Sequence, residues 1–209
     1  MDGKSLILKV TAVRVTDELL LESFVASFEE LNELIAWETD PLKQELAVGD
    51  PDQFGFRKWR PVLTCTAPSL LEPLYAKLPA RLPKLYERLV LTYRWAEVDL
   101  GTCRLLANPP GPDLSGLLQQ MSRDPALWSS LLPAGYIQFG RGPDMDYDPV
   151  CFDIKSRKKN GECRIVKIDH EEILCNNRVK LVAELAPSFR ELVIRTIDQG
   201  SPETPDANS

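Results

Sequence analysis

The chain has 209 residues and a formal net charge of -6 at neutral pH, which fits one domain with additions better than two full domains. It contains no run of about 18 apolar residues, and its N-terminal segment lacks the pattern of a secretory signal, so we expect neither a membrane span nor secretion. The five cysteines are odd in number and form no C-x-x-C pair, which disfavours a disulfide framework and a zinc knuckle. We therefore expect a cytoplasmic protein with reduced thiols.

The first predicted elements are a strand and a long amphipathic helix. Residues 5–15 are rich in aliphatic and β-branched side chains, which is typical of a strand. Apolar residues then recur at intervals of three and four, which predicts a helix over Asp17–Trp37 with Thr16 or Asp17 as its N-cap. The stripe consists of Leu20, Phe24, Phe28, Leu31 and Ile35.

The same segment is strongly acidic, because no Lys or Arg lies between Arg14 and Lys43. Four of its carboxylates project opposite the apolar stripe, and we call them the acidic ridge. Two interpretations fit the ridge: a solvated helix face, or a docking surface for a basic protein partner. The acidic ridge consists of Glu18, Glu22, Glu29 and Glu33.

The stretch FGFRKWRP, residues 54–61, alternates aromatic and basic side chains. Such side chains can stack on bases and contact phosphates. Three basic residues make a small electrostatic footprint on an acidic chain, however, so we expect a half-buried strand or loop and regard nucleic acid as an unlikely partner.

From Ala67 onward the pattern changes to short helices followed by a series of strands. Ser69 and Glu72 have capping-box spacing, but Pro73 predicts that their helix is short or distorted. Further along, we expect a helix from Pro83, a strand over Cys103–Asn108, helices beginning at Asp113 and Asp124, and strands in AGYIQFG, DPVCFDI and ECRIVKID.

The last two of these strands are predicted to form a hairpin over Pro149–Asp169. A three-residue loop, Lys159-Asn160-Gly161 with Gly161 left-handed, places Ile154 opposite Val166 and brings the apolar residues of both strands to one face. A two-residue loop would instead send the two apolar sets to opposite faces. We therefore expect the three-residue loop.

The only histidine, His170, lies between Asp169 and Glu171. In the predicted register it ends the strand opposite Val150, and Asp169 points to the other face, so the two side chains cannot easily share one metal ion. We expect a structural role, in which Asp169 accepts backbone N–H bonds at the strand end and His170 fills the rim of the sheet. Replacing His170 should then affect stability more than any activity.

An acidic loop precedes the hairpin. Asp144, Asp146 and Asp148 have the D-x-D-x-D opening of a calcium loop, but Pro149 replaces the required glycine and Lys155 replaces the closing glutamate. No nucleophile elbow and no glycine-rich phosphate loop occur. We expect no metal, no cofactor and no catalytic residue, although a hydrolase or nucleotide-dependent enzyme using Asp144–Asp148 with Asp169–Glu172 remains an alternative.

Near the C-terminus, Ser188 and Glu191 have capping-box spacing and an apolar face follows, which predicts a helix over Phe189–Gln199 that Gly200 ends. The residues after Gly200 carry too little apolar surface to order themselves, so we expect a mobile tail.

Three stretches, LLPAGYIQFGRGPDMDYDPVCFDI, ECRIVKIDHEEIL and VAELAPSFRELV, resemble signature segments of the Smi/Knr cell-wall-regulator family, within the SUKH superfamily of bacterial immunity proteins. The resemblance covers roughly Ser69–Ile197 and includes the Asp169-His170-Glu171 strand end and the Ser188-Phe189 helix start. It departs from the family pattern at Asp148-Pro149, where a Gly-Asp commonly precedes the strand.

The resemblance implies an α+β fold, with a mixed, mostly antiparallel sheet packed against helices. Residues 1–66 would be an N-terminal extension packed on the core, residues 67–199 the SUKH-like core, and residues 200–209 a disordered tail. The resemblance also implies a non-enzymatic protein-interaction domain that neutralises a toxin, with a basic toxin domain as a candidate partner, or acts as a scaffold or regulator. A housekeeping regulator that shares the fold is a further alternative. We take the acidic ridge and Asp144, Asp146 and Asp148 as candidate partner-binding residues, and the oligomeric state stays open.

Overall fold

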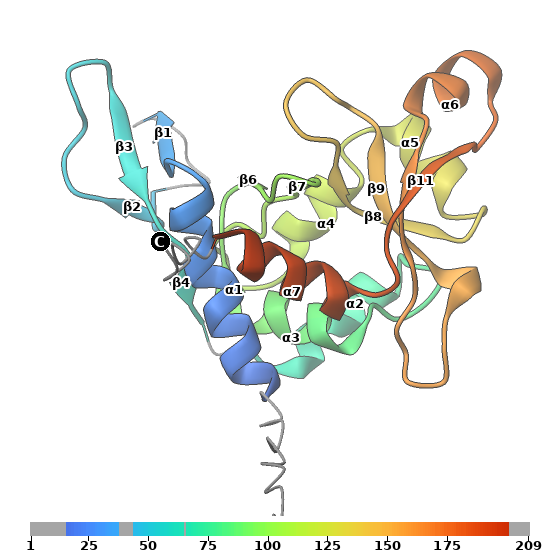
Figure 1. The fold of residues 1–209 in the computed structure, drawn as a ribbon, viewed down its shortest axis with the longest axis horizontal. Coiled ribbons are helices and arrows are strands. Elements are labelled where there is room, and N and C mark those ends of the chain that lie inside the picture. The colour runs from blue at the N-terminus through green and yellow to red at the C-terminus, as the bar shows by residue number, and fades with distance from the viewer. Residues whose placement is uncertain (1–15, 38–43, 65, 201–209) are drawn as a thin grey trace, which may run out of the picture.

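The structure, a computed structural model, describes residues 16–37, 44–64 and 66–200. Its centre is a six-stranded sheet in which neighbours along the chain are neighbours in the sheet, and every pairing is antiparallel (Figure 1). The expected α+β class is confirmed. The strands are β6 (Val98–Asp99), β7 (Arg104–Leu105), β8 (Tyr136–Arg141), β9 (Pro149–Asp153), β10 (Ile165–Ile168) and β11 (Leu181–Ala186).

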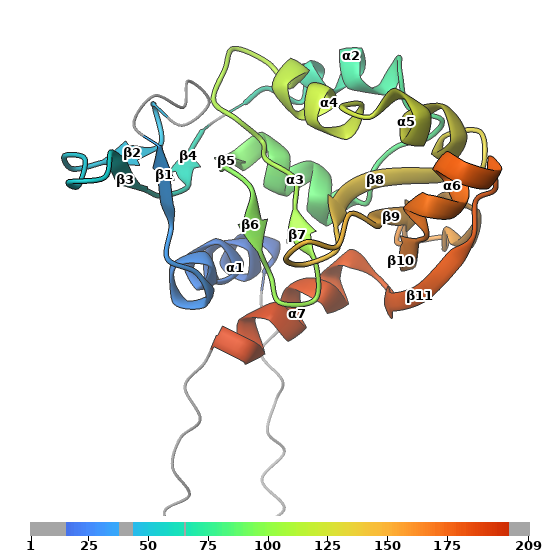
Figure 2. The same cartoon turned by 90° about the horizontal axis from the view of Figure 1, so that it is seen from above.

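One face of the sheet carries an aromatic core. Phe139 and Phe152, from neighbouring strands, stack with ring centroids 4.2 Å apart. Edge-on against them lie Tyr86 and Phe189, from helices on this face, and Phe24 contacts Phe189 in turn. The three helices are α1 (Asp17–Leu31), α3 (Lys84–Thr92) and α7 (Phe189–Gly200). Figure 2 shows α1 and α7 side by side below the sheet.

The opposite face of the sheet is also covered. Cys151, Val166 and Ile168 pack against Leu127, Leu131 and Ile173 in a second apolar cluster. The last three of these belong to two short helices, α5 (Pro125–Leu131) and α6 (His170–Asn176). The central strand β9 is consequently buried along its whole length.

A three-stranded sheet, β1-β3-β2, projects beside the N-terminal helix (Figure 1). Residues 56–59 of the FGFRKWRP segment form its middle strand. The sequence predicts a half-buried strand or a loop for this segment, and the strand is confirmed. A two-stranded sheet, β4-β5, follows. The strands are β1 (Ile35–Trp37), β2 (Ala47–Val48), β3 (Phe56–Trp59), β4 (Val62–Leu63) and β5 (Tyr93–Arg94).

The remaining helices begin close to the predicted signals. Pro68–Leu71 forms a 3₁₀ helix (η2) that continues into α2 (Glu72–Tyr75), so this region is short and distorted, but Ala67 stands at the N-cap in place of the predicted Ser69. The carboxylate of Asp113 accepts the N–H of Ser115, where α4 (Ser115–Met121) begins. Asp124 caps α5 by accepting two N–H bonds.

The N-terminal helix ends earlier than predicted. Thr16 is its N-cap, but α1 stops at Leu31 and not at Trp37. The side chain of Asn32 donates to the carbonyl oxygen of Asp99 at 2.7 Å, a tertiary contact that the local pattern cannot reveal. Ile35, which has helical spacing, instead belongs to β1. The predicted strand over residues 5–15 and the tail after Gly200 lie outside the described residues.

The hairpin β9–β10 turns where the sequence predicts. The N–H of Lys158 donates to the carbonyl oxygen of Glu162 at 2.7 Å, which closes the loop Lys159-Asn160-Gly161. Gly161 has a φ of 86°, in the left-handed region that favours glycine. The predicted loop is therefore confirmed.

The predicted register of the hairpin is wrong. Ile154 does not pair with Val166, which lies opposite Cys151. Ile154–Ser156 forms a 3₁₀ helix, η3, capped by the carboxylate of Asp153, and these three residues leave the ladder and shift its register. The apolar pattern gave no warning because β9 is buried on both faces, so the alternation that would specify a register is lost.

The C-terminal helix α7 confirms the predicted one. The hydroxyl of Ser188 accepts the N–H of Glu191 at 3.1 Å, whereas the carboxylate of Glu191 contacts Arg195 in the next turn. Among the described residues, no helix combines the length and the apolar content that crossing a membrane requires.

Candidate functional site

The Asp169-His170 motif forms a helix start and not a strand end. Asp169 is the N-cap of α6 and accepts the N–H of Glu172 at 3.0 Å, and Lys180 contacts its other oxygen. These bonds, led by the one from Glu172, hold the pKa of Asp169 below its ordinary value. The expected acceptor role of Asp169 is confirmed, but the expected position of His170 opposite Val150 is wrong, because Lys167 occupies it.

His170 contacts the acidic loop. Oδ1 of Asp148 accepts the backbone N–H of His170 at 2.9 Å and lies 2.7 Å from Nδ1 of its ring. The structure thus joins two segments that the sequence presents as separate clusters. A carboxylate at Nδ1 favours a proton on that nitrogen, and in the neutral ring this leaves Nε2 as an acceptor. In the described part of the chain, Nε2 has no hydrogen-bond partner.

The three loop aspartates serve different contacts. Burial pushes the pKa of Asp146 upward, but hydrogen bonds from Lys167 and from the N–H of Asp148 outweigh it, so this pKa lies below its ordinary value. Asp144 is exposed and has a φ of 51°. Asp146 and Asp148 both approach Nζ of Lys167, at 2.9 and 4.0 Å. Within residues 16–37, 44–64 and 66–200, no group of His, Cys, Asp or Glu is placed to hold a metal ion.

A groove of about 620 Å³ opens beside this loop, and we call it the His170 groove. It lies between the end of α4, the start of α5, strand β8, the acidic loop and α6. Its walls combine charged, amide, aromatic and aliphatic side chains. The lining residues include Arg123, Gln138, Arg141, Tyr147, His170 and Leu174.

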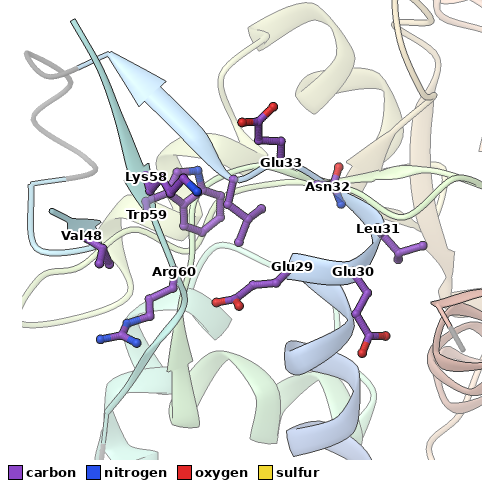
Figure 3. Close-up of a pocket in the computed structure, with 10 residues that line it drawn as sticks. Glu29, Glu30, Leu31, Asn32, Glu33, Val48, Lys58, Trp59 and Arg60 are labelled. Atoms are coloured by element: carbon purple, nitrogen blue, oxygen red, sulfur yellow. The ribbon is translucent and has the colours of Figure 1, made fainter. Parts of the chain in front are cut away.

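A second groove, of about 640 Å³, lies where α1 ends beside the three-stranded sheet, and we call it the acidic groove (Figure 3). Glu29, Glu30 and Glu33 line one side. Lys58 and Arg60, at the end of β3, line the other. Among the described residues, no carboxylate of this groove lies within 4 Å of a cationic nitrogen.

The structure divides the acidic ridge. Glu18 pairs with Arg88 at 2.6 Å and is therefore partly neutralised. Glu22 is exposed on the helix. Glu29, near the end of the helix, lines the acidic groove. Glu33 reaches the same groove from beyond the helix, because α1 stops at Leu31.

Burial makes three of the four described cysteine thiols poor nucleophiles. Cys103, Cys151 and Cys163 are buried, and burial raises the pKa of each thiol, that of Cys103 to about 12. A thiol in an apolar environment remains protonated at neutral pH and is inert. Cys175 is exposed on α6.

Sequence reasoning missed most of the His170 groove. Arg123, Tyr147 and Leu174 come from a helix junction, a loop and a helix, and no local motif links them. The three groups meet only through the fold.

Comparisons of the chain with models of known protein families, with curated proteins and with solved structures find no match.

Proposed function

We propose that this chain is a cytoplasmic, non-enzymatic protein-interaction domain of the immunity-protein or regulator kind, and that a basic segment of its partner docks in the acidic groove. One observation supports this proposal above the others: Glu29, Glu30 and Glu33 are exposed and have no cationic partner in the described part of the chain. Uncompensated charge at a concave surface raises the local concentration of an oppositely charged partner and speeds association.

The opposite wall of the acidic groove restricts the partner. Lys58 and Arg60 would repel a uniformly cationic segment, so the basic residues of the partner lie along the α1 side. Val48, 37% exposed, adds an apolar contact on the sheet side. A basic segment with an apolar residue toward the sheet therefore suits the groove best.

The resemblance to SUKH immunity proteins supports the same class of function. A hydrolase or nucleotide-dependent enzyme is less favoured, because Asp146 contacts Lys167, Asp148 contacts His170 and Asp169 caps a helix, so each has a structural partner. A housekeeping regulator with the same fold differs from an immunity protein in the genes that surround its own gene. A toxin gene beside the gene for this chain would favour immunity, and a biosynthetic neighbourhood would favour a housekeeping role.

The test begins with the partner protein, which affinity capture from native cell lysate supplies. A variant with Glu29→Gln, Glu30→Gln and Glu33→Gln removes the free charges of the groove without touching the apolar stripe. We expect its association rate at low salt to fall several-fold. The difference should shrink as salt rises, because screening limits the reach of these charges to about 8 Å near physiological ionic strength.

Two control variants make the result specific. Glu72→Gln, Glu171→Gln and Glu184→Gln together remove the same number of exposed charges away from the groove and should leave the rate nearly unchanged. A variant with Glu18→Gln and Glu22→Gln separates the helix part of the ridge from the groove. Equal association rates for the groove variant and the wild type at low salt would exclude the groove as the docking site.

A further inference from the structure

The His170 groove is remote from the acidic groove. It lies around α5 and α6, whereas the acidic groove lies between α1 and β3, on the other side of the molecule (Figure 1). A ligand of the His170 groove would therefore not depend on the partner proposed for the acidic groove.

Tyr147 gives the His170 groove an aromatic wall. The guanidinium of Arg141 lies 5.7 Å from the centre of its ring, and Arg141 is itself held by Glu97 at 2.6 Å. Tyr147 nevertheless remains 53% exposed, and Leu174, 52% exposed, lines the same groove from α6. Exposed aromatic and aliphatic groups at one concave site are suited to an apolar, planar ligand.

The polar groups of the groove are not all satisfied. Glu97 is occupied by Arg141 and Arg104, and Asp124 is occupied by the N–H groups at the start of α5. Arg123 is exposed and, within the described residues, has no carboxylate within 4 Å. Arg123 is therefore a cation of the groove that has no ion-pair partner among the described residues.

His170 adds a fixed acceptor. Because Asp148 contacts Nδ1, the ring cannot turn freely, and Nε2 of the neutral ring has no donor among the described residues, so it can accept a bond from a ligand. The ring of Tyr147 lies edge-on to that of His170, with centroids 6.3 Å apart. An aromatic wall, an acceptor and a cation thus meet in one groove.

We propose that the His170 groove binds a small planar molecule that carries both an N–H or O–H donor and an anionic group. The ring lies against Tyr147 and Leu174, the donor bonds to Nε2 of His170, and the anionic group pairs with Arg123. The volume of about 620 Å³ falls within the usual range of small-molecule sites.

Three probes separate these contributions. Indole-3-acetate carries the ring, the N–H donor and the carboxylate; 1-naphthaleneacetate lacks the donor; indole-3-acetamide lacks the charge. We expect indole-3-acetate to bind most tightly, and the other two to bind about fivefold or more weakly, since each loses one hydrogen bond or one ion pair. Titrations followed by amide ¹H–¹⁵N spectra give each dissociation constant.

The single histidine of the chain makes the readout direct. Its imidazole ¹⁵N resonances belong to His170 without further assignment, so they report both the tautomer and the approach of a donor to Nε2. Indole-3-acetate should shift Nε2, whereas 1-naphthaleneacetate should shift it little. Amide shifts should concentrate near Tyr147, His170 and Leu174.

Variants at exposed positions complete the test without threatening the fold. Arg123→Gln and Tyr147→Ala should each weaken indole-3-acetate binding about fivefold or more, while Lys155→Gln, a matched loss of exposed charge elsewhere, should not. Equal affinities for the three probes would overturn the proposal, as would unchanged binding in Arg123→Gln. An unmoved Nε2 resonance at saturation would overturn it too.

Discussion

Asp148 joins the acidic loop to the start of α6. Its Oδ1 accepts the backbone N–H of His170 and contacts the ring, across 22 residues of sequence, and its side chain is only 16% exposed. Asp148→Ala leaves both donors without this acceptor. We expect it to lower the free energy of unfolding by about 1–3 kcal/mol, measured by urea denaturation. His170→Ala retains the backbone bond and should cost less.

A neighbouring aspartate provides the control. Asp144 is exposed, and its positive φ is one that asparagine tolerates well. Asp144→Asn should therefore change the free energy of unfolding by less than about 0.5 kcal/mol. If Asp148→Ala proves equally mild, the contact with His170 does not stabilise the loop.

At the scale of elements, Glu162 links the hairpin to α7. Its Oε2 accepts the N–H of Phe189 at 3.2 Å. Burial raises the pKa of Glu162 and outweighs the opposing effects of the N–H of Phe189 and of Arg190. The ionised form is therefore less favourable in the folded chain than in the unfolded chain, whose Glu pKa is about 4.3.

This sign predicts a pH-dependent variant. Well below the unfolded pKa of about 4.3, Glu162 is protonated in both states, and Glu162→Gln should match the wild type. As pH rises through the unfolded pKa and then the raised folded pKa, the wild type loses stability that the variant keeps. Chemical denaturation at several pH values should measure the difference in free energy of unfolding between the variant and the wild type. This difference should favour the variant more at pH 7 than at pH 4.

Asp169→Asn is a matched variant whose effect on stability should depend on pH in the opposite direction. Its folded pKa lies below the ordinary value, so the carboxylate stabilises the fold above the unfolded pKa of about 3.9, and this contribution is lost as pH falls through the folded pKa. The asparagine variant should be less stable than the wild type at pH 7 and approach it at low pH. The same direction for both variants would contradict the pKa assignments.

Local signals predict where elements begin, but not how they pair. Asp124 and Ser188 cap helices as their spacing predicts, and Gly161 takes the left-handed turn. The register of β9 and β10 depends on η3, whose three residues leave the strand because Asp153 caps them, and on burial of both faces of β9. Neither follows from alternation along a single strand.

The candidate site shows the same division. His170 and the loop aspartates are conspicuous in the sequence, yet only the fold reveals that Asp148 contacts His170. Arg123 and Tyr147 carry no local signature, because only the fold brings their separate segments to one groove. The acidic side of the other groove was predictable, since the charge asymmetry before Lys43 is visible in the sequence alone.

At the scale of the molecule, the aromatic core joins the N-terminal helix to the sheet. Phe24 is fully buried and contacts Phe28 at 5.1 Å and Phe189 at 6.2 Å between ring centroids. Phe189 in turn contacts Tyr86 and Phe152. Helix α1 therefore shares one core with α7 and the sheet, although it belongs to the segment that the sequence suggests as an extension.

This shared core predicts that the helix and the sheet unfold together. Phe24→Ala should lower the free energy of unfolding by about 3–5 kcal/mol, because it leaves a cavity among close-packed rings. Calorimetry should show a single transition at a lower midpoint, and tryptophan fluorescence should follow the same curve. Leu19→Ala, on the same helix but 55% exposed, should change the midpoint little. Two separate transitions in Phe24→Ala, the lower one confined to the N-terminal helix, would instead show that residues 1–66 form a dispensable extension.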